Sequence, residues 1–365
     1  MSFAADGFAA PPFEFAEEIR AAAGDPERAL RLAPRLARAL GVAADASAWG
    51  AQGEASPERS KGSTGGGSIR RLWEGLAALG ALDLTVARTL EPHLDALTIL
   101  AQARAAGHDV HVPEDATWGV FAAEGPGTRL SASADADGNW HLDGDKPWCS
   151  LADTVSHALI TAWTSAHGRR LFVVRLDDPG VTVGAGNWVA RGLSAVRTVP
   201  LSLRHVPALP VGPEDWYLRR PGFALGGVGV AAVWWGGASA LAGTLLRALG
   251  EREPDQIALH HLGACDAALH AAGAALAGAA HEADASGDCS WPAALRVRSI
   301  VHDACETVLT AVAHTLGPGP LTQDEEHARR VADLQVYLRQ HKPERDLAAV
   351  GEGLLQGLPA VWSDR

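Results

Sequence analysis

The chain of 365 residues is long enough for two or three domains, and its 47% hydrophobic and 20% charged residues predict a large buried core. The formal net charge of −12 argues against non-specific binding to nucleic acid or to an anionic membrane surface. The N-terminus lacks the basic start and apolar block of a secretory signal. The four cysteines form no C-x-x-C pair, so we expect a cytoplasmic protein with buried thiols and no metal site.

The first third of the chain is predicted to be helical. Apolar residues recur at helical spacing at Leu30, Ala33, Ala37 and Leu40. Residues 51–68 are rich in glycine and serine and predict a mobile loop, whose triple glycine lacks the Gly-Lys-Ser/Thr of a nucleotide-binding loop. The helical pattern returns over 69–106. His93 lies on its second helix, close to the apolar stripe of Val86, Leu90, Leu94, Leu97 and Ala101.

From Thr117 to Leu218 the pattern becomes that of β-strands. Val199, Leu201 and Leu203 alternate with polar or turn residues, and turn dipeptides recur at short intervals. Asp137-Gly138 and Asp143-Gly144 both predict turns, so a hairpin is expected to lead into a short strand that ends on Trp148-Cys149-Ser150. The segment therefore predicts a small antiparallel barrel or sandwich.

The end of that strand is a candidate binding site. The indole of Trp148 offers a face for stacking, and the hydroxyl of Ser150 can hydrogen-bond a ring heteroatom, so the pair suits a flat aromatic ligand. The alternative is that Trp148 is a core residue and Ser150 a turn residue, because tryptophans are usually buried.

Helices resume after Pro221 and continue to the end as a predicted bundle of four or five. The uncharged stretch from Pro221 to Leu246 is long enough to span a bilayer. Its seven glycines and few large aliphatic residues favour a helix at the centre of the bundle or at a subunit contact instead. We therefore expect the α+β class, with a helical domain at 1–115, a β domain at 116–220 and a helical bundle at 221–365.

This order of elements, together with a series of weak motifs, resembles the acyl-CoA dehydrogenase superfamily. The block from Asn139 to Ser150 is similar to the family's x-L-x-G-x-K-x-(Trp/Phe)-x-(Ser/Thr) element, and Trp188 to Leu193 to its W-x-x-x-G-M segment. Three further stretches look like its first β strand with the glycine-proline turn, its glycine-rich turn near the cofactor and its late C-terminal helix: 119–128, 317–320 and 333–340.

The resemblance implies FAD as the cofactor. Trp148 would pack against the isoalloxazine, and Ser150, next to Cys149, would hydrogen-bond near N5. Further contacts implied by the resemblance come from Phe121, Ala122, Ala123, Thr128, Gly317 and Gly319. The superfamily usually forms homo-dimers or homo-tetramers, which we expect here as well.

The resemblance fails at the catalytic glutamate. The family carries this base either after the late-helix tyrosine, where this chain has Leu338 and Arg339, or on the first C-terminal helix, where 227–231 holds no acid. Flavin monooxygenases of the same fold do not need the glutamate, and some carry a histidine where His93 falls. His93 would then donate a proton or a hydrogen bond.

Other positions for a relocated base stay open. Asp324, Glu325 and Glu326 form an acidic run that is expected to be a helix N-terminus, and Arg339 and His341 either face the site or cap their helix.

Three functions follow as hypotheses. The first is an FAD-dependent oxidoreductase, of dehydrogenase or monooxygenase type, that acts on a specialised small molecule. The second is an acyl-CoA dehydrogenase with a relocated base, acting on an acyl thioester. The third is a scaffold or partner subunit without catalysis, in which 228–237 forms a subunit contact.

Overall fold

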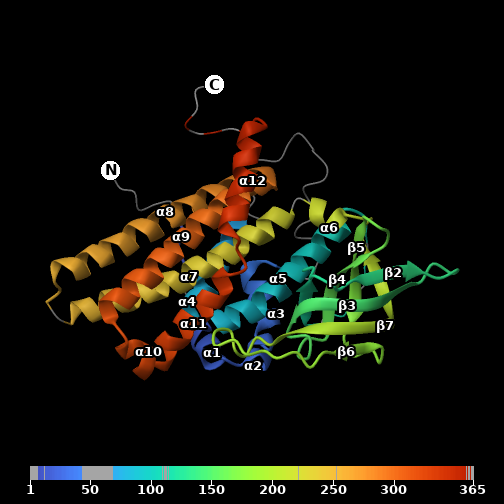
Figure 1. The fold of residues 1–365 in the computed structure, drawn as a ribbon, viewed down its shortest axis with the longest axis horizontal. Helices are drawn as coiled ribbons and strands as arrows, with labels where there is room; N and C mark the ends of the chain where they lie inside the picture. Colours follow the sequence, from blue (N-terminus) through green and yellow to red (C-terminus); the bar gives the residue numbers. More distant parts are fainter. Residues whose placement is uncertain are drawn as a thin grey trace.

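The computed structural model describes residues 7–42 and 69–362, except for positions 12, 109, 111, 112, 114, 221, 252, 359 and 361. The predicted loop at 51–68 lies outside these described residues. Helices make up the left and centre of the molecule and a β-sheet makes up the right (Figure 1). The α+β class is confirmed, with helices at both ends of the chain and the sheet between them.

Within the described residues, five helices precede the sheet. They are α1 (Ala16–Ala21), α2 (Pro26–Leu30), α3 (Ala33–Leu40), α4 (Ile69–Leu82) and α5 (Leu84–Ala105). Asp83 separates α4 from α5, since its carboxylate accepts the backbone N–H of Val86 at 2.8 Å and so caps the new helix. The apolar stripe predicted on α5 is largely buried.

The sheet has seven strands: β1 (Trp118–Phe121), β2 (Leu130–Ala134), β3 (Trp140–Ser150), β4 (His157–Trp163), β5 (Arg169–Arg175), β6 (Val181–Val183) and β7 (Thr198–Val211). Strands β2, β3, β7, β5 and β4 pair in that order, and β4 meets β2 again at Ser131 and Trp163, so the five form a closed barrel. Most pairings are antiparallel, as predicted, but β1 and β2 run parallel to β4.

One of the two predicted turns before Trp148 is wrong. Asp137-Gly138 does turn the chain between β2 and β3. Asp143-Gly144 instead lies inside the single long strand β3, at a register shift against β7. Gly144 has φ +124°, and a Cβ there would overlap the carbonyl oxygen of Arg129. The dipeptide therefore forms a bulge that only glycine can occupy.

Seven helices follow the sheet: α6 (Trp216–Arg219), α7 (Gly222–Gly250), α8 (Gln256–Ser286), α9 (Trp291–Leu316), α10 (Gly319–Gln323), α11 (Glu325–Leu338) and α12 (Pro343–Leu355). Helix α7 lies at their centre, in contact with α4, α8, α9 and α11. A Cβ at Gly236 would overlap the Ala77 carbonyl of α4, so this glycine allows the two backbones to touch.

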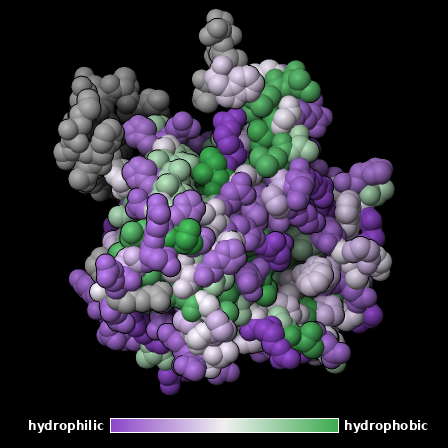
Figure 2. All heavy atoms as spheres, turned by 60° about the vertical axis from the view of Figure 1, so that its left-hand side comes forward, coloured by the Kyte–Doolittle hydropathy of each residue, from purple (hydrophilic) through white to green (hydrophobic). Residues whose placement is uncertain are grey.

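Among the described helices, α7 and α8 are long and apolar enough to cross a membrane by length and composition alone. In α7, 67% of the most apolar stretch is buried inside the molecule, as expected for a core helix; in α8 the share is 28%. Hydrophilic residues cover most of the face in Figure 2, with apolar residues scattered among them rather than in a continuous belt.

Helix α5 lies between the two parts of the molecule. Ile99, Leu100 and Ala103 pack with Trp118 and Leu171 of the sheet in one apolar cluster. On its other sides α5 contacts α4, α7 and α11. The first and last helical segments thus share one core. The domain boundaries near positions 115 and 220 stay a prediction.

Candidate active site between helix α5 and the sheet

The end of strand β3 has an unusual backbone. Trp148 and Leu151 have φ values of +60° and +56°, in the left-handed region that residues other than glycine rarely occupy. Trp148 is 62% exposed, whereas Cys149 between the two is fully buried. The alternative that Trp148 is a core residue is therefore wrong. Strained residues of this kind concentrate at functional sites, so the strand end is a candidate for ligand binding.

Lys146 anchors this strand end from inside the sheet. Its ammonium is 1% exposed and donates to Glu124 Oε1 at 2.8 Å, and to the carbonyl and hydroxyl oxygens of Thr161 at 2.9 Å each. Burial lowers the pKa of Lys146, and these three acceptors compensate for the lost hydration. The strand is thereby fixed two residues before the exposed indole.

A crevice separates the strand end from α5. Its wall includes Arg88 and Pro92 of α5, Phe121 of β1, and Ser150 and Leu151. The hydroxyl of Ser150 accepts a hydrogen bond from Arg88 Nη2 at 3.2 Å and lies 2.9 Å from Thr198 Oγ1. The structure thus brings together two of the predicted site residues, Phe121 and Ser150.

Arg88 connects the crevice to the half-buried carboxylate of Glu91. Its Nη1 donates to Glu91 Oε2 at 3.4 Å, and the hydroxyl of Tyr337 on α11 donates to the same oxygen at 3.2 Å. Burial raises the pKa of Glu91 to about 6, against the opposing effect of Arg88. Thr198, Ser150, Arg88, Glu91 and Tyr337 form one hydrogen-bonded chain from the sheet to α11.

Glu91 was not predicted as a site residue, although a signal for it exists in the sequence. Polar residues recur along α5 at intervals of three and four, which places them on one face of the helix: Arg88, Glu91, Asp95, Thr98 and Gln102. This polar stripe runs along the same helix as the predicted apolar stripe.

The polar stripe faces a row of glycines on α7. Gly222, Gly226 and Gly229 follow one another at helical spacing, and a Cβ at Gly226 would lie 3.1 Å from Asp95 Oδ1. Between the two rows lies the α5–α7 cavity, of about 40 Å³, whose wall includes Glu91 and Asp95. Burial raises the pKa of Asp95 as well, opposed by the Arg220 guanidinium.

His93 lies one residue beyond Pro92 but is not among the described residues that line the crevice or the α5–α7 cavity. Its side chain is buried, and Nδ1 has no hydrogen-bond partner within the described part of the chain. Burial lowers its pKa to about 4, so the imidazole is neutral at pH 7. A role for His93 stays a prediction, and a neutral ring can accept or donate a hydrogen bond there.

The remaining predicted residues have different surroundings. The Ala122 carbonyl accepts from Thr161 Oγ1 at 3.4 Å, Ala123 is exposed, and Thr128 closes its own turn by donating to Gly125 O at 3.0 Å. Burial raises the pKa of the Cys149 thiol to about 12, so this residue is an unreactive core thiol.

Gly317 and Gly319 lie apart from the crevice. Gly317 ends α9 with φ +64°, and Gly319 begins α10. Helix α10 lies at the lower left of Figure 1, away from the sheet on the right. Within one copy of the chain, the predicted role of these glycines near the cofactor therefore has no support from the crevice geometry.

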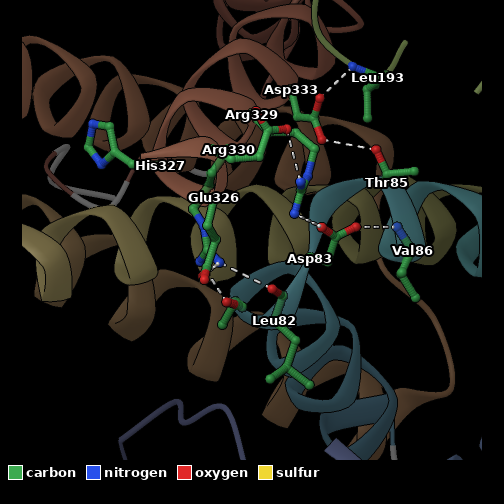
Figure 3. Close-up of polar contacts among 12 residues, drawn as sticks. Leu82, Asp83, Thr85, Val86, Leu193, Glu326, His327, Arg329, Arg330 and Asp333 are labelled. Atoms are coloured by element: carbon green, nitrogen blue, oxygen red, sulfur yellow. Dashed lines mark hydrogen bonds and ion pairs between the residues drawn. The ribbon is translucent and has the colours of Figure 1, made fainter. Parts of the chain in front are cut away.

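Helix α11 is fixed against α5 and the loop before β7 by a polar cluster (Figure 3). Asp333 accepts the Leu193 N–H at 2.5 Å and the Thr85 hydroxyl at 3.0 Å, and Arg329 pairs with Asp83 at 3.2 Å. A Cβ at Gly192 would overlap the carbonyl oxygen of Ala332. These contacts fix the direction of the helix that carries Tyr337.

The acidic run at 324–326 is confirmed as a helix N-terminus. Asp324 caps α11 by accepting the His327 N–H at 3.0 Å. His341, a second candidate from the sequence, is buried between Ser299 of α9 and Asp346 of α12 rather than in the crevice. Arg339 pairs with Glu306 on α9.

Comparison with known proteins identifies the fold. No family model and no curated protein matches the sequence. Among solved structures, KijD3 in complex with FMN and dTDP-3-amino-2,3,6-trideoxy-4-keto-3-methyl-D-glucose matches with a TM-score of 0.73 and 22% identity, over 98% of each chain.

Two further solved structures match over almost the whole chain. The nitrososynthase from Micromonospora carbonacea var. africana has a TM-score of 0.73 at 20% identity, over 94% of each chain. Butyryl-CoA dehydrogenase from Megasphaera elsdenii has a TM-score of 0.71 at 19% identity, over 97% of this chain and 100% of that one. The expected acyl-CoA dehydrogenase fold is confirmed.

Proposed function

We propose that this chain, which has the acyl-CoA dehydrogenase fold, is an FAD-dependent oxidoreductase that acts on a small, specialised substrate. The observation that carries this proposal is the hydrogen-bonded chain from Ser150 through Arg88 to Glu91. It links the strand end suited to a flat ring with a half-buried carboxylate whose pKa is raised to about 6.

The strand end fits a flavin in its chemistry. Trp148 presents an exposed indole, and the hydroxyls of Ser150 and Thr198 lie beside the crevice with donors and acceptors for a heterocycle edge. Bound there, a flavin would supply two-electron redox chemistry. Flavins are present in related folds, since the KijD3 complex contains FMN and a glutaryl-CoA dehydrogenase complex contains FADH2.

The residues of this chain would handle the proton. Glu91, with its pKa near 6, is mostly ionised at pH 7 and can accept a proton from a substrate, a task that favours a base titrating near the working pH. Arg88 and Tyr337 donate to one carboxylate oxygen and so hold the group in a single orientation. Glu91 thereby takes the role of the glutamate absent from both familiar positions.

A dehydrogenase of acyl thioesters is the second candidate, and the same carboxylate favours it. The size of the α5–α7 cavity argues for a short substrate, because about 40 Å³ holds roughly three water-sized groups. Anaerobic bleaching of bound flavin by a short acyl-CoA, lost in Glu91→Gln, would establish this candidate. An absence of bleaching with short, branched and long chains would exclude it.

The proposal is tested first by titrating the purified protein with FAD, and in parallel with FMN, and recording the flavin spectrum. We expect binding with a Kd below about 50 μM. Trp148→Ala should weaken binding about tenfold through loss of stacking. Trp362→Ala, at an indole that is also largely exposed, should leave the affinity unchanged. No binding of either flavin would overturn the proposal and favour a scaffold.

A further inference from the structure

We propose that the α5–α7 cavity binds the amino group of an aliphatic primary amine, which serves to anchor the substrate of the proposed oxidoreductase. That the amine is a substrate rests on the proposed function. The binding site itself is argued from the wall of the cavity alone.

The wall is acidic, and the arginines that pair with its two acids, Arg88 and Arg220, are not among its described lining residues. Glu91 and Asp95 line it, and among the described lining residues there is no lysine or arginine. The rest of the wall is mostly apolar, with Leu76, Leu94 and Leu225 as examples. A ligand group in the cavity therefore contacts two carboxylates in an apolar surrounding, where opposite charges attract strongly.

Both carboxylates have unused acceptor capacity. The donors from Arg88 and Tyr337 both reach Glu91 Oε2, and within the described part of the chain Oε1 accepts no hydrogen bond. Asp95 pairs with Arg220 at 3.8 Å, beyond hydrogen-bond distance, and accepts no hydrogen bond from any described residue. Both side chains line the cavity and are partly exposed, 14% for Glu91 and 23% for Asp95, so a ligand in the cavity can donate hydrogen bonds to these oxygens.

Three arginines surround the two acids, and none of them is among the described residues that line the cavity. Arg88 points from Glu91 toward Ser150, Arg220 is 2% exposed and donates to Gln102, and Arg298 donates to the Gly227 carbonyl. Tyr217 and Tyr337 complete the titratable groups around the two acids. An ammonium group, with three donors and no acceptor, matches the cavity side, whereas a carboxylate or phosphate would be repelled.

The room for this group comes from the glycines of α7. A Cβ at Gly226 would stand 3.1 Å from Asp95 Oδ1 and fill the space in front of that oxygen. A cavity of about 40 Å³ holds roughly three water-sized groups, which suits an ammonium with one or two methylene groups.

The position along α5 suits an anchoring role. Arg88 lines the crevice and Asp95 lines the α5–α7 cavity, seven residues further on, which is roughly 10 Å along a helix. An amine held at Asp95 would thus place the rest of the molecule toward Glu91 and Arg88, so the reacting part would lie on the side of the cavity that is nearer to the crevice.

Calorimetric titration with propylamine, 1-propanol and propionate tests the inference, using both flavin-loaded and flavin-free protein. We expect propylamine alone to bind. Asp95→Asn and Gly226→Ala should each weaken its binding at least tenfold, whereas Asp137→Asn, in the exposed β2–β3 turn, should leave it unchanged. Equal binding of amine and alcohol, no amine binding, or full affinity in Asp95→Asn would overturn the proposal.

A second readout is the pH profile. Because protonation removes the charge of Glu91, propylamine affinity should fall as the pH drops through about 6, and Glu91→Gln should weaken this dependence. A profile that is the same in wild type and Glu91→Gln would contradict the assignment. Amine binding to a protein that takes no flavin would refute the proposed function but leave the amine site intact.

Discussion

Ionisation of Glu91 should lower the free energy of unfolding as the pH rises, and the Glu91→Gln variant should show by how much. Its pKa is about 6 in the folded protein, compared with 4.5 for an ordinary glutamate, because burial disfavours the charged form. A carboxyl group whose folded pKa is raised stabilises the fold fully below its unfolded pKa, and this contribution is lost as the pH rises through the folded pKa.

The magnitude follows from the shift. The rise of about 1.5 units in the pKa of Glu91 lowers the free energy of unfolding by about 2 kcal/mol at pH 7.5. At pH 5, where the carboxyl group is only partly ionised, the same relation gives a loss of about 1 kcal/mol. Glu91→Gln removes the titration and keeps a similar shape. The free energy of unfolding of the variant, minus that of the wild type, should therefore increase by about 1 kcal/mol between pH 5 and pH 7.5.

Urea unfolding followed by circular dichroism at several pH values measures this difference directly. The substitution also alters the hydrogen bonds to Arg88 and Tyr337, which changes the free energy of unfolding by an amount that does not depend on pH. Only the pH-dependent part of the difference between variant and wild type therefore reports the titration of Glu91. Glu344→Gln, at an exposed position of α12, should show no such pH dependence. A flat difference for Glu91→Gln would refute the reasoning.

Three further outcomes are expected. Gly192→Ala should destabilise the protein by at least about 2 kcal/mol in urea unfolding, because its Cβ would overlap the Ala332 carbonyl, whereas Gly351→Ala on α12, with open space around it, should not destabilise it. Asp333→Ala should cost about 1–3 kcal/mol in the same assay, since the buried Leu193 N–H loses its acceptor. At pH 8, Cys149, Cys265 and Cys305 should react with a thiol reagent only on unfolding, because all three are buried and burial raises the pKa of Cys149 to about 12; rapid labelling of Cys149 in the native protein would contradict its burial.

The order of helices and strands was predictable from local patterns, but the details at Trp148 were not. The sequence places a strand end at Ser150, and the structure confirms it. The exposure of the indole depends on the left-handed backbone at Trp148 and on the register shift between Lys146 and Cys149 against β7. That register is decided by pairing with a strand some fifty residues later in the chain, which a local pattern does not contain.

The same limit explains the error at Asp143-Gly144. The dipeptide is typical of a hairpin turn and also of a bulge, because both need a glycine with positive φ. The neighbouring strands favour the bulge over the turn, because β3 pairs with β2 on one side and with β7 on the other across this point. A continuous strand between two partners gains more backbone hydrogen bonds than a turn would.

The polar stripe of α5 shows what a sequence reader can and cannot infer. Its spacing is visible, and a polar stripe ordinarily predicts a solvated face. Here the face is half-buried against α7, where Gly222, Gly226 and Gly229, more than a hundred residues later, leave room for it. Only the combination of a polar row on one helix and a glycine row on another indicates an internal polar site.

This combination also explains why the missing glutamate does not by itself imply an inactive protein. Proton abstraction requires a carboxylate within reach of the substrate, on whichever helix can supply it. The late helix α11 carries Tyr337 followed by Leu338, and so it supplies a hydrogen-bond donor in place of a carboxylate. Helix α5 supplies the carboxylate at Glu91, and Arg88 ties that group to Ser150. In the proposed oxidoreductase the acid and its support would thus have exchanged helices. Loss of substrate-driven flavin bleaching in Glu91→Gln, with flavin binding retained, is the result that distinguishes this arrangement from a structural ion pair.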